Sequence, residues 1–190
     1  MAAAIEIPVE PLTEAAFAPF GQIVGVRDGA PLFAAPGVKT WGVDFKIDGT
    51  VEIHFARFDH ADGMAFAKME RHFNVTQAFL PLDGAPSVKV FATPTDPDPS
   101  AIPEREDMRA FYLDGGRGVM MWKGTWHSDI LPAQPPTGAV AMITAIETTV
   151  EMAEMGKAGR YDGKLTQIVD FAERFDQTFR ISDPNGVIAG

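Results

Sequence analysis

Two stretches of the sequence hold side chains that could transfer protons. The first spans residues 68–84 and contains Glu70 and His72, which share one face if this stretch is a strand. The second spans residues 116–131 and contains His127. An imidazole titrates near neutral pH, and a carboxylate can orient it or act as a base itself. We therefore expect acid–base chemistry in a pocket of a small β-barrel, where the two stretches face each other.

The same stretches offer a set of metal ligands. The best set is Glu70, His72, Gln77 and His127. Glutamine is a poor ligand for transition metals, which prefer imidazole and carboxylate groups, and the sequence holds no His-x-His pair. We therefore expect no firmly bound cofactor, and a weakly held divalent ion is the alternative.

The remaining histidines have a simpler structural interpretation. His54 and His60 have no titratable neighbour at a useful spacing, so we expect both to be hydrogen-bonded structural residues. The paired placement of the other two histidines favours a functional role instead.

The composition excludes several classes of protein. The chain has 190 residues, of which 46% are hydrophobic and 22% are charged, as in an ordinary globular domain. A formal net charge of -10 disfavours nucleic acid and anionic membranes as partners, although a small anion could bind where basic residues gather. There is no cysteine, no long apolar run and no signal-peptide pattern near the start. We therefore expect a cytoplasmic protein that binds a small molecule.

Short alternating segments and frequent turn residues predict an all-β fold. The predicted strands cover residues 5–9, 22–26, 41–47, 51–55, 64–73, 76–82, 87–92, 111–113, 119–123, 126–131 and 139–150. Thr13 is the expected N-cap of a short N-terminal helix. The spacing of apolar residues predicts an amphipathic helix over residues 165–175, packed on the outside of the barrel or on a second subunit. We expect one domain over residues 1–190, with the barrel at about 5–150 and a helical extension at about 151–190.

The spacing of the candidate residues resembles the two sequence motifs of the cupin superfamily. Glu70 and His72 stand at the first pair of ligand positions, with Gln77 at the acidic position. In the second motif His127 stands at the histidine position, and Trp122 replaces the usual proline. This resemblance implies a cupin-type double-stranded β-helix barrel.

Longer segments resemble the ureidoglycolate lyase family. They read PLTEAAFAPFG at 11–21, MERH followed by TQAFLPL at 69–82, and RAF, GV and WH at 109–127, in the family's order. The family is a cupin-type barrel, generally dimeric, that splits (S)-ureidoglycolate into glyoxylate and urea at the end of allantoin breakdown. The resemblance implies that this chain is a carbon–nitrogen lyase of purine catabolism and a homodimer.

The resemblance also implies roles for individual residues. His127, His72 and Glu70 are expected to carry the proton transfers, with no redox cofactor required. A second group is expected to bind the small anionic substrate. Its two basic members are candidates for binding the carboxylate, and its glutamine is a candidate for binding the ureido group. This group comprises Arg71, Gln77, Phe79, Lys123, Trp126 and Ser128.

The sequence departs from the family pattern around the second motif. Met120, Met121 and Trp122 stand where the family usually has Asn-Tyr-His, and Ser128 and Asp129 stand where it usually has His-Pro. A more apolar pocket suits a less polar molecule. Two alternatives therefore stay open: an enzyme of the same fold acting on another small 2-hydroxy or 2-oxo acid, with or without a metal, and a non-catalytic binding barrel.

Overall fold

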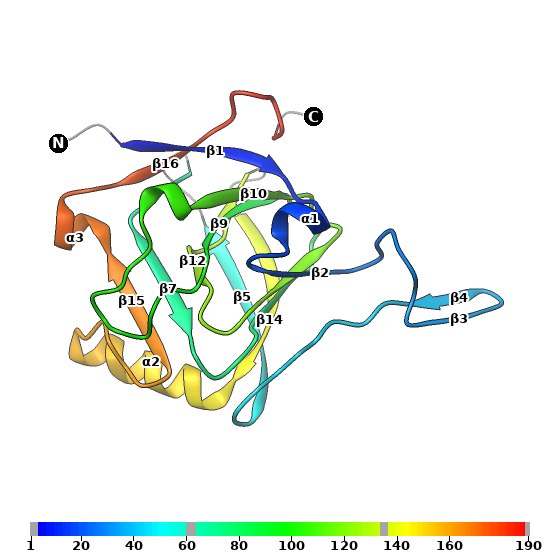
Figure 1. The fold of residues 1–190 in the computed structure, drawn as a ribbon, viewed down its shortest axis with the longest axis horizontal. Helices are drawn as coiled ribbons and strands as arrows, with labels where there is room; N and C mark the ends of the chain where they lie inside the picture. Colours follow the sequence, from blue (N-terminus) through cyan, green and yellow to red (C-terminus); the bar gives the residue numbers. More distant parts are fainter. Residues whose placement is uncertain (1–3, 60–63, 134–136, 189–190) are drawn as a thin grey trace.

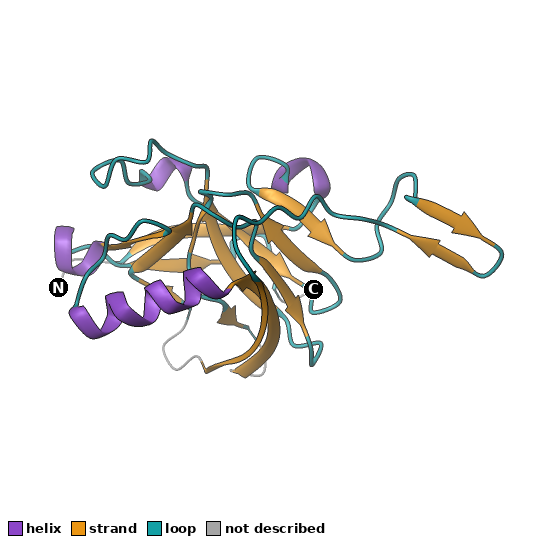
Figure 2. Cartoon of the chain, turned by 90° about the horizontal axis from the view of Figure 1, so that it is seen from below, coloured by secondary structure: helices purple, strands orange, loops and turns teal. Residues whose placement is uncertain are grey.

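The computed structural model describes residues 4–59, 64–133 and 137–188. These residues form mainly strands, arranged in two curved sheets with a two-stranded arm and three α-helices (Figures 1 and 2). The all-β prediction is confirmed, and two sheets that curl around a shared interior are consistent with a cupin-type barrel. No helix in the described ranges is long and apolar enough to cross a membrane.

The larger sheet follows the order β15-β7-β12-β9-β10-β1-β16-β6, and β13 also pairs with β9. Its strands are β1 (Ile5–Pro11), β6 (Ala65–Phe66), β7 (Lys68–His72), β9 (Ser87–Ala92), β10 (Arg109–Leu113), β12 (Trp126–His127), β13 (Leu131–Pro132), β15 (Thr166–Asp170) and β16 (Phe179–Ser182). Most neighbours are antiparallel, but β1 runs parallel to both β10 and β16. Strands from distant parts of the sequence therefore lie side by side along β1 (Figure 1).

The smaller sheet follows the order β2-β11-β8-β14-β5. Its strands are β2 (Gly21–Val24), β5 (Val51–Asp59), β8 (Ala78–Pro81), β11 (Gly118–Met121) and β14 (Thr137–Ala145). β14 and β5 pair along their full lengths, and β5 forms one edge of the sheet. The even-numbered residues of β5 face the interior, because side chains alternate along a strand.

One hydrophobic cluster packs between the two sheets. α1 (Glu14–Phe17) places Phe17 there, edge-on to Phe91 and Phe111 with ring centroids 5.0 Å and 5.5 Å away. The helix begins where predicted, because the Thr13 hydroxyl accepts a hydrogen bond of 3.2 Å from a backbone N–H of the first turn. Packed aromatic rings therefore anchor α1 against the interior of the barrel.

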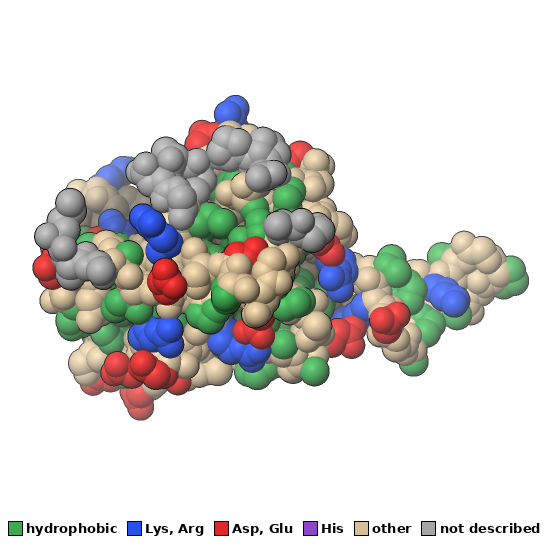
Figure 3. All heavy atoms as spheres, turned by 90° about the horizontal axis from the view of Figure 1, so that it is seen from above, with side chains coloured by type: hydrophobic (Ala, Val, Ile, Leu, Met, Phe, Trp, Pro, Cys, Tyr) green, Lys and Arg blue, Asp and Glu red, His purple; other side chains and the backbone are tan. Residues whose placement is uncertain are grey.

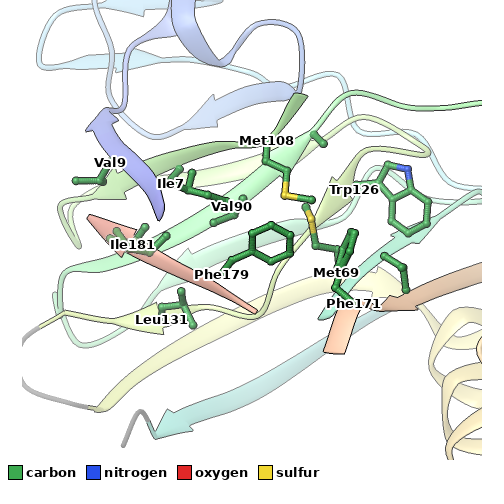
Figure 4. Close-up of a cluster of buried hydrophobic side chains, with 14 residues drawn as sticks. Ile7, Val9, Met69, Val90, Met108, Trp126, Leu131, Phe171, Phe179 and Ile181 are labelled. Carbon is green, nitrogen blue, oxygen red and sulfur yellow. The ribbon is translucent and has the colours of Figure 1, made fainter. Parts of the chain in front are cut away.

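A second hydrophobic cluster covers the outer face of the larger sheet (Figure 4). Met69 and Trp126 project into it from β7 and β12. α3 (Phe171–Phe175) contributes Phe171, which packs edge-on against Phe179 of β16 at 5.0 Å. The C-terminal elements therefore seal this face of the sheet.

Two elements predicted near the C-terminus are only partly correct. The strand predicted over 139–150 ends at Ala145, and α2 (Ile146–Ala158) begins there, although its first turns contain β-branched residues that favour strands. The helix predicted over 165–175 is helical only in its second half, α3, because its first half is the strand β15, which pairs with β7 along its whole length. Pairing with β7 satisfies the backbone groups of that sheet edge, and this outweighs the helical spacing of the apolar residues.

Two further expectations need correction. The region at 151–190 is not a purely helical extension, because β15 and β16 are strands of the larger sheet. The predicted strand at 41–47 belongs to no sheet, and an isolated bridge joins Ile47 to Val75. Backbone hydrogen bonds between the segments around these two residues still hold the stretch against the barrel.

β3 (Phe33–Ala35) and β4 (Val38–Thr40) form an arm that stands clear of the body (Figures 1, 2 and 3). Its apolar side chains are exposed, and Leu32 at its base is 80% exposed. The outer face of β5 is also apolar and exposed, with Phe55 at 76%. Both surfaces are free to contact another molecule.

Candidate active site

The pairing of β7 with β12 places Glu70 directly opposite His127. His72 follows on the same face of β7. Oε1 of Glu70 lies 3.6 Å from Nε2 of His72 and 3.9 Å from Nδ1 of His127, and the two imidazole centroids are 5.4 Å apart. Both imidazoles are buried, whereas the Glu70 side chain is 24% exposed. The structure thus brings together the three residues expected to carry proton transfer.

Hydrogen bonds orient the two imidazoles. Nδ1 of His127 lies 3.3 Å from the backbone carbonyl oxygen of Ser128. A carbonyl only accepts, so this contact assigns the proton to Nδ1 and leaves a lone pair on Nε2. Nδ1 of His72 lies 3.1 Å from the Thr166 hydroxyl. Both Nε2 atoms are buried and have no hydrogen-bond partner among the described residues, but that of His72 lies 3.6 Å from the Glu70 carboxylate, so Nε2 of His127 is the better placed to contact a ligand.

A cavity of about 300 Å³ lies beside this cluster, between the sheets and α2. Its lining residues are His54, Phe58, Glu70, Gln77, Phe79, Lys89, Asp129, Met142, Thr144, Thr148, Thr149 and Met152. A smaller cavity of about 90 Å³ reaches His127 and shares Glu70 and Asp129 with the larger one. Glu70 therefore stands between the imidazoles and a space of the size that suits a small metabolite.

Two of the expected substrate-binding residues line the larger cavity. Nε2 of Gln77 donates to the Thr144 hydroxyl at 3.4 Å, while its Oε1 is buried and has no partner in the described part of the chain. The ring of Phe79 lies edge-on to His127, with centroids 5.9 Å apart. Gln77 can therefore accept a hydrogen bond from a ligand in the cavity, where the Phe79 ring forms part of the lining.

Lys89 is a cavity residue that the sequence reasoning missed. It is 1% exposed, and its Nζ donates to the carbonyl oxygen of Ser128 at 2.5 Å. Burial lowers its pKa to about 8, although the charges of Asp129 and Glu70 act in the opposite direction. The signal was present in the sequence, because a lysine inside the apolar run SVKVFA is unusual for a buried strand.

Burial and neighbouring charges set the protonation states of the cluster. Burial raises the pKa of Glu70, but the close approach of the His72 imidazole and the charges of His127, His72 and Lys89 together lower it to about 2. Burial holds the pKa of His127 well below its usual value; Lys89 lowers it further, and Glu70 raises it. At neutral pH the cluster therefore holds a carboxylate beside a neutral His127.

Arg71 and Trp126 do not line the cavity. Trp126 belongs to the hydrophobic cluster on the outer face of the larger sheet (Figure 4), and Arg71 lies beside it. The Arg71 guanidinium donates to Oε1 of Gln167 at 2.9 Å and to the backbone oxygens of Thr95 and Asp96 at 2.9 Å and 2.8 Å. It also stacks over the Trp126 ring, 4.4 Å from a ring centroid. Arg71 therefore links β15 to the proline-rich segment that follows β9. Its position does not support contact with substrate.

Lys123 and Ser128 also have other partners. Nζ of Lys123 lies 2.5 Å from a carboxylate oxygen of Asp48, away from the cavity. The Ser128 hydroxyl accepts from the backbone N–H of Val90 at 3.0 Å and donates to the carbonyl oxygen of Asp129 at 2.7 Å. Among the substrate-binding residues expected from the sequence, Gln77 and Phe79 are thus the ones that line the larger cavity.

The other residues singled out in the sequence are the two remaining histidines and the apolar residues that depart from the family pattern. His54 is hydrogen-bonded, as expected, but the expectation that it has no useful titratable neighbour is wrong: its Nε2 lies 2.8 Å from the Glu52 carboxylate, and it lines the cavity. His60 lies outside the described residues. Met120 is fully buried and Trp122 donates from Nε1 to a backbone carbonyl at 3.0 Å, so these departures from the family pattern lie away from the larger cavity.

Glu70, His72 and His127 also form a group that could hold a metal ion. One ligand atom from each residue lies within 4.8 Å of the others. Two imidazoles and a carboxylate suit a divalent transition metal, and the unpartnered Nε2 atoms are free to coordinate one. The described residues therefore contain three of the four ligands expected from the sequence in one cluster.

An all-β barrel that holds paired imidazoles and a carboxylate beside a small cavity is typical of a cupin-type enzyme acting on a small molecule. A search against models of protein families extends this to a particular family. The model of the ureidoglycolate lyase family matches residues 4–161, and the chain belongs to this family.

Curated relatives support the same assignment. A protein named ureidoglycolate lyase from Brucella melitensis biotype 2 is 30% identical over 180 residues, covering 90% of this chain and 95% of that protein. A protein of the same name from Rhodobacter capsulatus is 31% identical over 152 residues, covering 77% and 90%. Another from Azotobacter vinelandii is 32% identical over 134 residues, covering 66% and 76%. The resemblance found in the sequence segments is confirmed.

Proposed function

We propose that this protein is a lyase that splits (S)-ureidoglycolate into glyoxylate and urea at the end of allantoin breakdown. The observation that carries this proposal is the cluster of Glu70, His72 and His127 beside a small cavity, in a chain of this family. Family membership favours this reaction over the two alternatives, an enzyme for another hydroxy or oxo acid and a non-catalytic binding barrel.

The proposed reaction needs no net proton. The hydroxyl group of the substrate loses a proton as its carbon becomes a carbonyl, the carbon–nitrogen bond breaks, and the departing urea nitrogen gains a proton. Nε2 of His127 takes the first proton and returns it to the nitrogen. Its low pKa suits the return step, because the imidazolium readily gives up its proton. Glu70, 3.9 Å from Nδ1, stabilises the transient imidazolium.

Other residues position the reacting groups. His72 lies behind Glu70, 3.6 Å from its carboxylate oxygen, and holds that carboxylate in place. His72 therefore acts through Glu70 as a positioning residue. The free Oε1 of Gln77 accepts an N–H of the ureido group, and Phe79 shields the site from water.

We propose that any metal is held weakly. The ligands would be Glu70, His72 and His127, and a bound divalent ion would polarise an oxygen of the substrate as a Lewis acid. The fourth ligand expected from the sequence, Gln77, is a poor ligand for transition metals, and its Nε2 donates to the Thr144 hydroxyl. Metal analysis of the purified protein, before and after dialysis against a chelator, tests this: a full equivalent that survives dialysis would contradict weak binding.

We also propose a cytoplasmic homodimer formed through the exposed apolar surfaces. Val51, Ile53 and Phe55 on the outer face of β5 are 50%, 58% and 76% exposed, and Leu32 and Phe33 of the arm are 80% and 55% exposed. Exposed apolar groups of this extent mark interaction sites in soluble proteins. Two copies related by a two-fold axis could each place an arm on the β5 face of the other.

The proposed activity is tested directly with purified protein and (S)-ureidoglycolate. Glyoxylate and urea should appear in equal amounts and well above the rate in buffer alone. Decay at the buffer rate, with and without added divalent metal, would show that the assigned substrate is wrong.

A further inference from the structure

Lys89 is a charged side chain in an otherwise apolar strand. Its neighbours Val88 and Val90 face the outer hydrophobic cluster, whereas Phe91 belongs to the cluster between the sheets. Strand alternation therefore turns Lys89 inward together with Phe91. Its ammonium group lies at the wall of the larger cavity and is almost completely shielded from solvent.

No ion pair among the described residues neutralises this ammonium group, although the charges of Asp129 and Glu70 act on it. Nζ donates to the Ser128 carbonyl oxygen at 2.5 Å and lies 4.0 Å from the centroid of the Phe79 ring. Neither partner carries a charge, and within the described ranges no carboxylate forms an ion pair with Lys89. The hydrogen bond to Ser128 uses one of the three N–H donors of an ammonium group. A buried charge of this kind is costly for the fold, which is consistent with its use by a ligand.

Among the described residues that line the larger cavity, Lys89 is the only lysine or arginine. The other basic candidates are engaged elsewhere, Arg71 with Gln167 and Lys123 with Asp48. The lining also contains the carboxylates of Glu70 and Asp129, which repel an anion. A negatively charged ligand group is therefore favoured at Lys89 and disfavoured at the carboxylates.

We propose that Lys89 binds the carboxylate of the substrate and so directs the rest of the molecule toward Glu70 and His127. The carbonyl that holds the ammonium group belongs to Ser128, one of the positions where this chain departs from the family pattern. The inference concerns small carboxylates in general, and it rests on the proposed function for the identity of ureidoglycolate.

The test compares the unmodified protein with Lys89→Met and with Lys123→Met as the matched control. Methionine keeps much of the apolar length of lysine without its charge. NMR titration measures the Kd of glycolate, a small hydroxy acid, and of glycolamide, its uncharged amide; turnover of (S)-ureidoglycolate is measured in parallel. In Lys89→Met the Kd of glycolate should rise by about tenfold or more, as for a lost charge-assisted hydrogen bond, while that of glycolamide stays unchanged.

The outcomes separate this inference from the proposed function. A selective loss of glycolate binding in Lys89→Met supports the inference, whether or not ureidoglycolate is turned over. Equal glycolate affinity in Lys89→Met and the unmodified protein overturns it, even if ureidoglycolate is cleaved. An equal loss in Lys123→Met, or a parallel loss of glycolamide binding, overturns it as well, because the effect would then be general damage to the cavity.

Discussion

Nδ1 of His127 lies 3.9 Å from Oε1 of Glu70, the residue directly opposite to it on the neighbouring strand. β12 supplies the imidazole from a strand of two residues, held between β7 on one side and β9 on the other. A slip of one residue in either pairing would turn His127 to the opposite face of the sheet. The chemistry of the site therefore depends on the register of one very short strand.

His127→Asn is expected to lower kcat for (S)-ureidoglycolate by about 10²- to 10⁴-fold, the usual contribution of a general acid–base group. Asparagine keeps a polar group but cannot exchange a proton near neutral pH. Steady-state kinetics measure the change, and far-UV circular dichroism checks the fold. His72→Asn should cause a smaller loss, since His72 acts through Glu70. A larger loss in His72→Asn than in His127→Asn would reverse the two roles.

The pH dependence of KM should report the charge of Lys89. Its pKa of about 8 means that the amine loses its proton above that pH and no longer attracts a carboxylate. kcat/KM should therefore fall above about pH 8, whereas kcat should hold to higher pH because a bound carboxylate raises the pKa of Lys89. In Lys89→Arg the fall should move to higher pH, since guanidinium stays protonated. If kcat/KM falls at the same pH in Lys89→Arg and in the unmodified protein, the group that titrates is not Lys89.

Lys89→Met should increase the free energy of unfolding at pH 7 by about 1–4 kcal/mol, as when buried charges are replaced by apolar side chains. The folded pKa of about 8 lies below the usual 10.5, so the unfolded chain binds more protons between these values. The contribution of Lys89 to stability is therefore least favourable below pH 8 and improves as pH rises toward 10.5. Urea denaturation across this range should show the Lys89→Met advantage shrinking with pH. A variant that is less stable at pH 7 would indicate a structural role.

Arg71→Met should destabilise the fold without changing the chemistry of the site. Its removal leaves Oε1 of Gln167 and the carbonyls of Thr95 and Asp96 without their donor, at a cost of about 2–5 kcal/mol. Chemical denaturation measures this loss, and kcat and KM below the unfolding transition should stay within about twofold of the unmodified protein. A rise in KM with unchanged kcat in the folded variant would contradict this prediction and indicate that Arg71 contacts the substrate.

Phe55→Glu should weaken self-association. A carboxylate on the outer face of β5 cannot be buried against an apolar surface without a large desolvation cost. Analytical ultracentrifugation should show a dimer for the unmodified protein and a shift toward monomer for the variant. Arg57→Glu, on the same face but in a polar position, serves as the control. A monomeric unmodified protein would contradict the proposed interface.

The sequence revealed part of the site because strand alternation is a local property. The spacing of Glu70 and His72 placed both on one face, and the structure agrees. The same alternation placed Arg71 on the opposite face, where it contacts Gln167. Its assignment to the substrate came from the family resemblance, which did not carry that geometric information.

Other features depended on contacts between distant segments. Lys89 was overlooked because it lies outside the two stretches with obvious titratable clusters, and strand pairing alone brings it near Ser128. The strand at 87–92 was predicted with the bounds of β9, since apolar β-formers fill it. β15 was mistaken for a helix, because its partner β7 lies far away in the sequence.

The parallel pairing of β1 with β10 and β16 has a consequence for synthesis on the ribosome. β1 is made early, but the strands that cover its two edges are made much later, and β16 comes from the far part of the sequence. Until Phe179–Ser182 has been translated, the nascent chain carries an open edge that another chain could pair with. The interval between translating β1 and β16 is therefore when protection by chaperones would matter most.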